Sequence, residues 1–176
     1  MKIKSNYKAY SGIGSRSTPA DVLDQMTTIA TQLEEEGYIL RTGGADGADT
    51  AFLDGIQDPN TVELYLPWQG FNGYESNYPQ PTKAALDLAA KYHPNWSKCS
   101  PNVRKFHARN SHQILGYQLD SPVDFVLCYT PKGDCVGGTA QAIRIADSEL
   151  IPVINFGLGI DYALNELDRL FEKLYG

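Results

Sequence analysis

The chain has 176 residues, of which 42% are hydrophobic and 20% are charged. This composition is ordinary for a globular protein and argues against a disordered chain or a coiled coil. The formal net charge is −6, from 15 Lys and Arg against 21 Asp and Glu. The surface therefore has no overall positive potential, which disfavours a protein that binds DNA over its whole surface.

The first half of the chain alternates apolar runs, glycine turns and amphipathic segments. A strand over 7–11 leads into a turn over 12–16. Thr18 and Pro19 then supply an N-cap hydroxyl and a first-turn proline for a helix, and Gly37 is expected to end that helix. The further elements predicted in this half are a strand over 38–40, a helix over 46–55 and a strand over 62–66.

The segment 68–81 has no clear period. A connection of this length is more often a lid or binding loop than a passive link. The alternative is an aromatic cluster that covers the edge of the sheet. The two interpretations rest on the same four side chains: Trp68, Phe71, Tyr74 and Tyr78.

The second half continues the alternation around a nearly continuous apolar run over 123–129. Such a run is typical of a strand buried on both faces of a parallel sheet. The pattern therefore predicts one domain, 1–176, with a Rossmann-like doubly wound α/β fold and a mostly parallel five-stranded sheet covered by helices on both faces. The other elements predicted here are helices over 82–91, 103–119, 140–150 and 161–174, a glycine-rich loop over 131–139 and a strand over 151–154.

Three glycine-containing turns leave strand ends and open helices: 12–16, 43–47 and 133–139. Glycine lets the backbone approach a ligand closely, and a helix start adds N–H groups and partial positive charge that suit a phosphate. In a sheet ordered 3-2-1-4-5 the first and last of these turns flank the point where the strand order reverses, which is where ligands bind. For each turn alone, the alternative is a tight turn needed only for packing.

Polar side chains near these turns provide candidate contacts. Ser15 and Arg16 place a hydroxyl and a guanidinium near the start of the first helix, where arginine can form a bidentate interaction with a phosphate. Asp46 and Asp49 are either helix-start carboxylates or groups that contact ribose hydroxyls or activate a water. Arg109 lies in a locally basic segment of an acidic chain, which favours an anion site.

Several classes of site are excluded by the motifs. The first turn lacks the third glycine of the dinucleotide fingerprint, no Gly-Lys-Ser/Thr follows a strand, and Gly-x-Ser-x-Gly is absent. His93, His107 and His112 show no metal-ligand spacing with Cys or carboxylates. We therefore expect no metal site and no cofactor other than a nucleotide-like ligand.

The remaining signals concern the compartment. Three cysteines in no C-x-x-C spacing suit a reducing compartment, and Cys135 in the glycine-rich loop is the thiol placed to touch a ligand. Residues 1–6 are not followed by an apolar signal-peptide core, and no apolar run approaches the roughly 20 residues of a membrane span. We expect a cytoplasmic protein with no membrane contact.

Four motifs resemble those of the SLOG superfamily, which contains the Rossmann-like domain of DprA/Smf proteins, the LOG phosphoribohydrolases and the small YspA-like proteins. They lie at 10–16, 41–49, 106–110 and 137–140. Their layout, with 151–153 following the last motif, is most similar to the YspA-like members. The resemblance leaves out roughly 68–101.

The resemblance implies a nucleotide or nucleotide-derived ligand and, frequently, a homodimer. It suggests Asp46, Asp49 and Arg109 as candidate catalytic residues. Combined with the turns above, the predicted ligand-binding residues are Gly12, Gly14, Ser15, Arg16, Gly43, Gly44, Ala45, Asp46, Asp49, Arg109, Asn110, Gly137, Gly138, Thr139 and Gln141.

Three functions follow from the resemblance, and whether the chain is an enzyme stays open. The favoured one is a nucleotide-binding sensor or processing protein. The second is a LOG-type nucleotide N-glycosidase, but the position that matches the LOG glutamate is Ala142, beside Gln141, and glycosidic cleavage needs a carboxylate. The third is a DprA-like adaptor for single-stranded DNA, which the net charge disfavours.

Overall fold

The computed structural model describes residues 7–176. Residues 1–6, on which the interpretation of the chain start rests, lie outside the described residues. Five strands form one parallel sheet in the order β3-β2-β1-β4-β5, which confirms the predicted Rossmann-like class and the conditional strand order. The strands are β1 (Ala9–Gly14), β2 (Ile39–Thr42), β3 (Val62–Leu64), β4 (Phe125–Tyr129) and β5 (Val153–Asn155).

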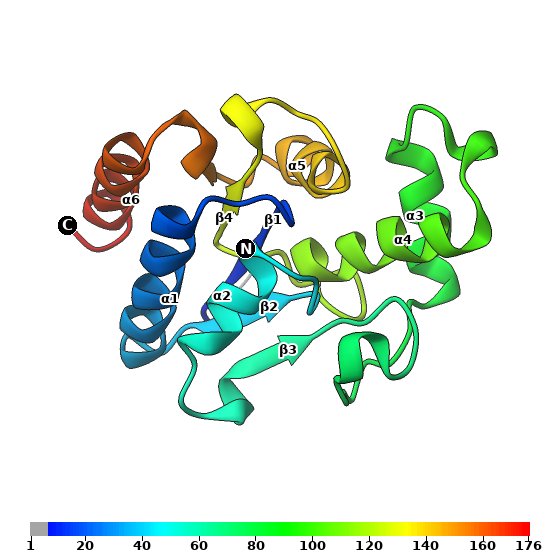
Figure 1. Ribbon diagram of the computed structural model, residues 1–176, viewed down its shortest axis with the longest axis horizontal. Coiled ribbons are helices and arrows are strands. Elements are labelled where there is room, and N and C mark those ends of the chain that lie inside the picture. Colours follow the sequence, from blue (N-terminus) through cyan, green and yellow to red (C-terminus); the bar gives the residue numbers. More distant parts are fainter. Residues whose placement is uncertain (1–6) are drawn as a thin grey trace, which may run out of the picture.

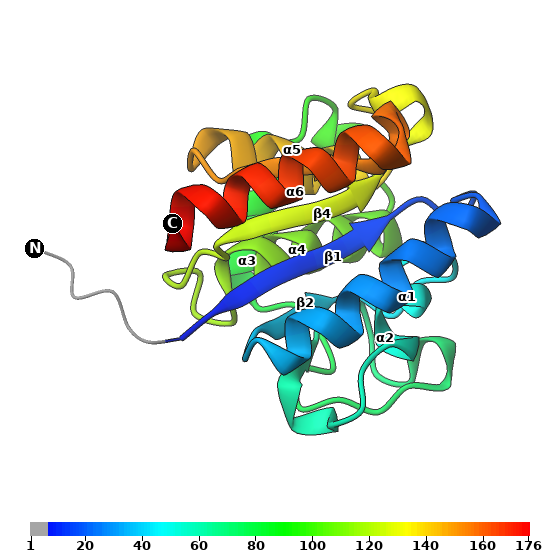
Figure 2. The same cartoon turned by 90° about the vertical axis from the view of Figure 1, so that its left-hand side faces the viewer.

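Helices cover both faces of the sheet, as Figures 1 and 2 show. One face carries α1 (Ala20–Glu35), α2 (Ala48–Asp54) and α6 (Ile160–Tyr175), and its core centres on the fully buried rings of Tyr10, Phe52 and Phe125. Burying large aromatic and aliphatic side chains is the main stabilising contribution here.

The opposite face carries α4 (Pro101–Leu115) and α5 (Thr139–Ser148), which pack on alternate residues of β1 and β4 such as Ile13, Val126 and Cys128. Because successive strand residues point to opposite faces, Tyr10 and Ile13 serve different cores. Helix α3 (Lys83–Tyr92) packs on the outside of α4 through small side chains, Ala85 and Ala89 against Ala108. The loop over 93–100 connects α3 to α4 on this side of the sheet.

The sequence patterns located the elements, but several boundaries differ. Helix α1 begins at Ala20, and no side chain of the described residues caps it, because the Thr18 hydroxyl instead donates to the Ser15 carbonyl oxygen at 2.6 Å. The prediction of Thr18 as N-cap was wrong. Gly37, at φ +84°, does follow the helix end as predicted.

Helix α4 also differs from its predicted span of 103–119. It begins at Pro101, because the Ser100 hydroxyl accepts the N–H of Val103, and it ends at Leu115, because Gly116 has φ +80°. Helix α2 begins later than predicted, since the backbone at Gly47 turns through φ +85°. Strands β3 and β5 are each three residues long, shorter than the predicted runs.

The segment 68–81 forms an aromatic cluster with α4. Its 3₁₀ helix η2 (Phe71–Gly73) brings Phe71 to 5.6 Å from Phe106 between ring centroids, and Trp68 lies 5.1 Å from Phe106. The edge-to-face geometry of these rings is the favoured one for aromatic pairs. An aromatic cluster is therefore present, and the interpretation of 68–81 as a lid or binding loop stays a prediction. Within residues 7–176, no helix is both long and apolar enough to cross a membrane.

Candidate functional site

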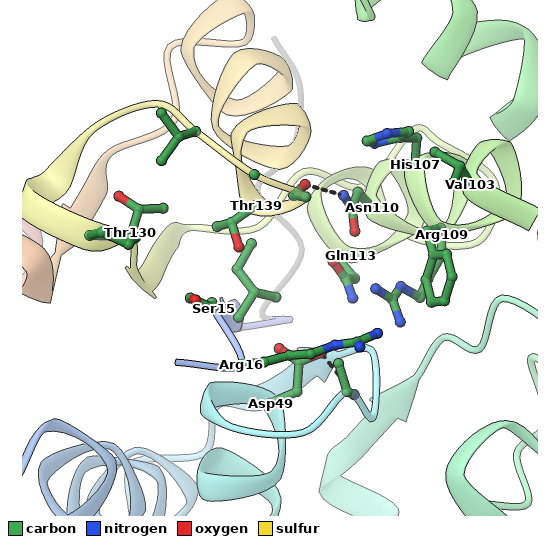
Figure 3. Close-up of a pocket in the computed structure, with 18 of the residues that line it drawn as sticks. Ser15, Arg16, Asp49, Val103, His107, Arg109, Asn110, Gln113, Thr130 and Thr139 are labelled. Carbon is green, nitrogen blue, oxygen red and sulfur yellow. Dashed lines mark hydrogen bonds between the residues drawn. The ribbon is translucent and has the colours of Figure 1, made fainter. Parts of the chain in front are cut away.

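A pocket of about 690 Å³ opens where β1 and β4 end, between α4 and the first turn of α5 (Figure 3). The strand order reverses between β1 and β4, so the pocket lies at the switch point where open α/β sheets bind ligands. Its volume falls within the usual range for small-molecule sites. Of the predicted ligand-binding residues, the pocket is lined by Gly14, Ser15, Arg16, Ala45, Asp49, Arg109, Asn110, Gly137, Gly138 and Thr139.

The other predicted residues lie outside the pocket lining, and two of the glycines serve packing. A Cβ at Gly12 would lie 2.7 Å from the Phe52 ring, so this glycine lets α2 approach β1. A Cβ at Gly43 would lie 2.2 Å from Nε2 of Gln113. These two glycines therefore give room to neighbouring side chains rather than to a ligand.

Gly44, Asp46 and Gln141 also lie outside the lining. The carbonyl of Gly44 accepts a hydrogen bond from the Asn72 side chain at 3.0 Å, and Asp46 is exposed. Gln141 is fully buried and donates to the Ala89 carbonyl oxygen at 3.0 Å, which ties α5 to α3. These three predicted positions therefore do not contact the pocket.

The carboxylate of Asp49 lies within the second glycine turn. It is 3% exposed and accepts the backbone N–H of Ala45 at 3.2 Å together with those of Gly43 and Gly14. Burial raises its pKa to about 6, and the charge of Arg109 and these hydrogen bonds oppose that rise. The N–H groups that a phosphate would use at this turn are therefore already bound to an internal anion.

Arg109 lies on α4 at the other side of the same carboxylate. Its guanidinium is held 5.8 Å above the Phe71 ring and 5.3 Å above the Phe106 ring, and it donates to the Gly43 carbonyl at 3.0 Å. The residue is 7% exposed, and its Nε makes no hydrogen bond within the described residues. Burial lowers the pKa of Arg109, and the charge of Arg16 acts in the same direction, against the charge of Asp49. Since a guanidinium has five donors, Arg109 retains capacity for a ligand.

Arg16 reaches the pocket from the first turn. Its side chain is exposed and forms no ion pair with any residue from 7 to 176. In Figure 3 the guanidinium groups of Arg16 and Arg109 approach each other, with the amide of Gln113 beside them. The Ser15 hydroxyl is used locally, in a 2.8 Å hydrogen bond with Ser17.

The third glycine turn is anchored to α4. Asn110 donates to the Gly138 carbonyl at 2.9 Å (Figure 3), and among residues 7–176 no side-chain cap is found at Gly138, where α5 begins. Thr130, at the end of β4, is held by hydrogen bonds to Asn155 on both its backbone and its side chain. The uncapped start of α5 therefore faces the pocket from a fixed position, and it supplies positive partial charge.

Sequence reasoning missed Gln113. This residue is 1% exposed and lines the pocket, and neither its Oε1 nor its Nε2 makes a hydrogen bond within the described residues. A buried amide without partners is unfavourable by about 1–3 kcal/mol for each unmet group. The available signal was periodicity, because Val103, Phe106 and Asn110 precede Gln113 on one face of α4, at spacings of three and four residues.

The pocket also contains two of the histidines. His93 and His107 line it, and together with Cys99 they form the group of side chains in the described chain that could hold a metal ion. Ligand spacing along the sequence predicted no metal site, because the fold alone brings these three side chains together. Cys135, by contrast, is exposed and lies outside the lining.

No family model and no curated protein matches this chain. Among solved structures, it is similar to DNA processing protein A from Helicobacter pylori, described for a unique mode of binding single-stranded DNA. The TM-score is 0.53 at 18% identity, over 84% of this chain and 64% of that chain. At this identity the similarity shows the fold alone, and this fold agrees with the resemblance of the motifs to the DprA domain. The chain spans less than two thirds of that relative's length.

Proposed function

We propose that the protein binds a nucleotide or nucleotide derivative in this pocket, with the phosphate between Arg16 and Arg109. The observation that carries the proposal is the pair of guanidinium groups, which repel each other across a pocket and have donors to spare. An anion bound between them would relieve that repulsion and accept charge-assisted hydrogen bonds from both.

The neighbouring groups support a nucleotide rather than a bare anion. The uncapped start of α5 adds backbone N–H donors for a phosphate. Gln113 offers an amide donor and acceptor pair deeper in the pocket, which suits a base edge or a ribose hydroxyl. The volume of about 690 Å³ leaves room for both parts of such a ligand.

The favoured activity is binding without cleavage. Asp49 is the one carboxylate among the described lining residues, and three backbone N–H groups already hold it. Ala142 is fully buried in the apolar core between the sheet and α5, so the position of the LOG glutamate carries no acid. No observation on the described residues therefore favours N-glycosidic cleavage. The homodimer and the cytoplasmic location stay predictions.

A thermal-shift screen of nucleoside mono-, di- and triphosphates, nucleosides and ADP-ribose tests the proposal. A ligand at 100 times its Kd stabilises by about 2.7 kcal/mol, which for a chain of this size raises the Tm by about 5–10 °C. Nucleosides without phosphate should give a much smaller shift.

The matched variants are Arg16→Ala and Arg169→Ala, since both remove one exposed arginine. Arg169 lies on α6 in a surface pair with Glu166, away from the pocket lining. We expect Arg16→Ala to weaken nucleotide binding at least about tenfold, the loss of a charge-assisted hydrogen bond, and Arg169→Ala to leave it unchanged. No shift at millimolar concentrations across the panel, or equal affinity in both variants, would overturn the proposal.

Single-stranded DNA is a second candidate, because the relative from Helicobacter pylori binds it and shares the fold. The pocket contains two arginines, so about two phosphates would be neutralised there. The logarithm of the binding constant would then fall with the logarithm of salt concentration with a slope of about −1.4. Fluorescence anisotropy of a labelled oligonucleotide measures this slope, and absent or salt-independent binding would exclude the candidate.

A further inference from the structure

A cluster of three metal-binding side chains lies at the edge of the pocket. His93 directly follows α3, Cys99 follows the 3₁₀ helix η3 (Trp96–Lys98), and His107 lies on α4. One ligand atom from each of the three lies within 4.8 Å of the others. None of the three is among the groups proposed above to hold the phosphate, although both histidines line the same pocket.

The distances between the sulfur of Cys99 and the ring nitrogens of His93 are close to those between two donor atoms on one zinc ion. The Cys99 Sγ lies 3.8 Å from Nδ1 and 3.9 Å from Nε2 of His93, and the rings of His93 and His107 are 4.3 Å apart between centroids. With Zn–N bonds of about 2.0–2.1 Å and Zn–S bonds of about 2.3 Å, tetrahedral geometry separates the donors by about 3.3–3.6 Å. The separations between Cys99 and His93 exceed this range by a few tenths of an ångström, and since all three donors lie within 4.8 Å of one another, no pair needs to close by more than about 1.5 Å.

His107 is prepared for such a role. It is 8% exposed, lines the pocket, and its Nδ1 makes no hydrogen bond within the described residues. This nitrogen is therefore available as a metal ligand.

The loop that carries the other two ligands is held in place. The Arg104 guanidinium donates to the Trp96 carbonyl at 3.1 Å and lies 5.1 Å from the centre of the Trp96 ring. The N–H of Cys99 donates to the same carbonyl. Nδ1 of His93 accepts the N–H of Asn95 at 3.1 Å. Metal binding through Nδ1 would replace this hydrogen bond, and Asn95 is exposed, so its N–H can turn to water.

We propose that His93, Cys99 and His107 form a binding site for a divalent transition metal ion of the zinc class, with an open fourth position toward the pocket. Thiolate and imidazole ligands select zinc-like ions over magnesium or calcium, which prefer oxygen. Both histidines line the pocket, whereas Cys99 does not. Three protein ligands with a free fourth position are typical of sites where the metal takes water or an oxygen of a bound ligand.

The test measures metal binding to the full chain without nucleotide, so it is independent of the proposed nucleotide binding. The phosphine-reduced protein is titrated with Co²⁺ and with Zn²⁺ in competition with a chromophoric chelator. We expect one equivalent to bind, with a sulfur-to-cobalt charge-transfer band and the visible bands of tetrahedral Co²⁺. Cys99→Ser and His93→Gln should weaken binding by at least about 100-fold, since loss of an outer-shell partner alone weakens it 10–100-fold.

The matched control is Cys135→Ser, which removes an exposed thiol outside the cluster and should leave affinity and spectrum unchanged. A second measurement uses only the wild-type chain: Zn²⁺ should slow alkylation of Cys99 but not that of Cys135, as read by peptide mass mapping. Absence of a sulfur band, equal affinity in Cys99→Ser and wild type, or no protection of Cys99 would each overturn the site.

Discussion

The carboxylate of Asp49 is expected to make the protein less stable as the pH rises. Its pKa is about 6 in the folded chain, against 3.8 without the surroundings of the fold, because burial penalises the charge more than Arg109 and the backbone N–H groups compensate. Between these two values the unfolded chain has released the proton while the folded chain retains it. The contribution of Asp49 to stability is therefore largest at low pH and is lost as the pH rises from about 4 to about 6.

The size of this effect follows from the shift. Roughly two pKa units at about 1.36 kcal/mol per unit amount to about 3 kcal/mol, most of it between pH 4 and pH 7. Asp49→Asn removes the titration while preserving shape. We expect the free energy of unfolding of Asp49→Asn, measured against that of the wild type, to rise by about 2–3 kcal/mol over this range.

Urea denaturation at several pH values measures the difference, in which other titrating groups cancel. Asp46→Asn is the matched control, because it makes the same chemical change three residues earlier at an exposed position, and its curve should run parallel to that of the wild type. If Asp49→Asn also runs parallel between pH 4 and pH 7, the assignment of a raised pKa to this buried carboxylate is refuted.

Three further substitutions test the packing around the site by urea denaturation. Gly12→Ala places a methyl group 2.7 Å from the Phe52 ring and should destabilise by about 1–3 kcal/mol through overpacking. Gln141→Ala removes a buried hydrogen bond between α5 and α3 and should cost about 1–3 kcal/mol. Glu63→Ala removes the 2.7 Å ion-pair partner of Arg41, which is 1% exposed, and should cost about 3 kcal/mol because it leaves a buried charge.

Each of these three has a distinct contradicting result. A stable Gly12→Ala that instead weakens nucleotide binding would make Gly12 a ligand contact. An unchanged Gln141→Ala would mean that the amide is not structurally engaged. The comparison variant is Asp87→Ala, which breaks an exposed ion pair with Lys83. If both variants lose the same small free energy of unfolding, the Arg41 pair contributes no more than a surface salt bridge.

Part of the candidate site could be predicted from the glycine turns. Arg16, Asp49, Arg109 and the turn at 137–139 were found because each follows a strand or lies on the helix before one, and parallel strands bring such positions to one edge of the sheet. The turns alone did not reveal which glycines face a ligand. Gly12 and Gly43 have the same local pattern as the lining glycines, but their free space is filled by side chains from α2 and α4.

The class of fold could be predicted from local sequence patterns. Alternating apolar runs, amphipathic helices and strand-end glycines report local backbone preference and burial, and these are enough for a doubly wound parallel sheet. The same local signals misplaced the cap at Thr18, because its hydroxyl has a competing acceptor in the Ser15 carbonyl.

Which polar groups already have hydrogen-bond partners, and which are available to a ligand, depends on the packing of the folded chain. Asp49 takes the N–H groups of the second turn, whereas Gln113 and Arg109 keep unused donors. The meeting of His93 and Cys99 with a histidine on α4 depends on how a loop outside the motifs folds back. Whether a donor is satisfied is set by atoms from segments remote in the chain, and no local periodicity records them.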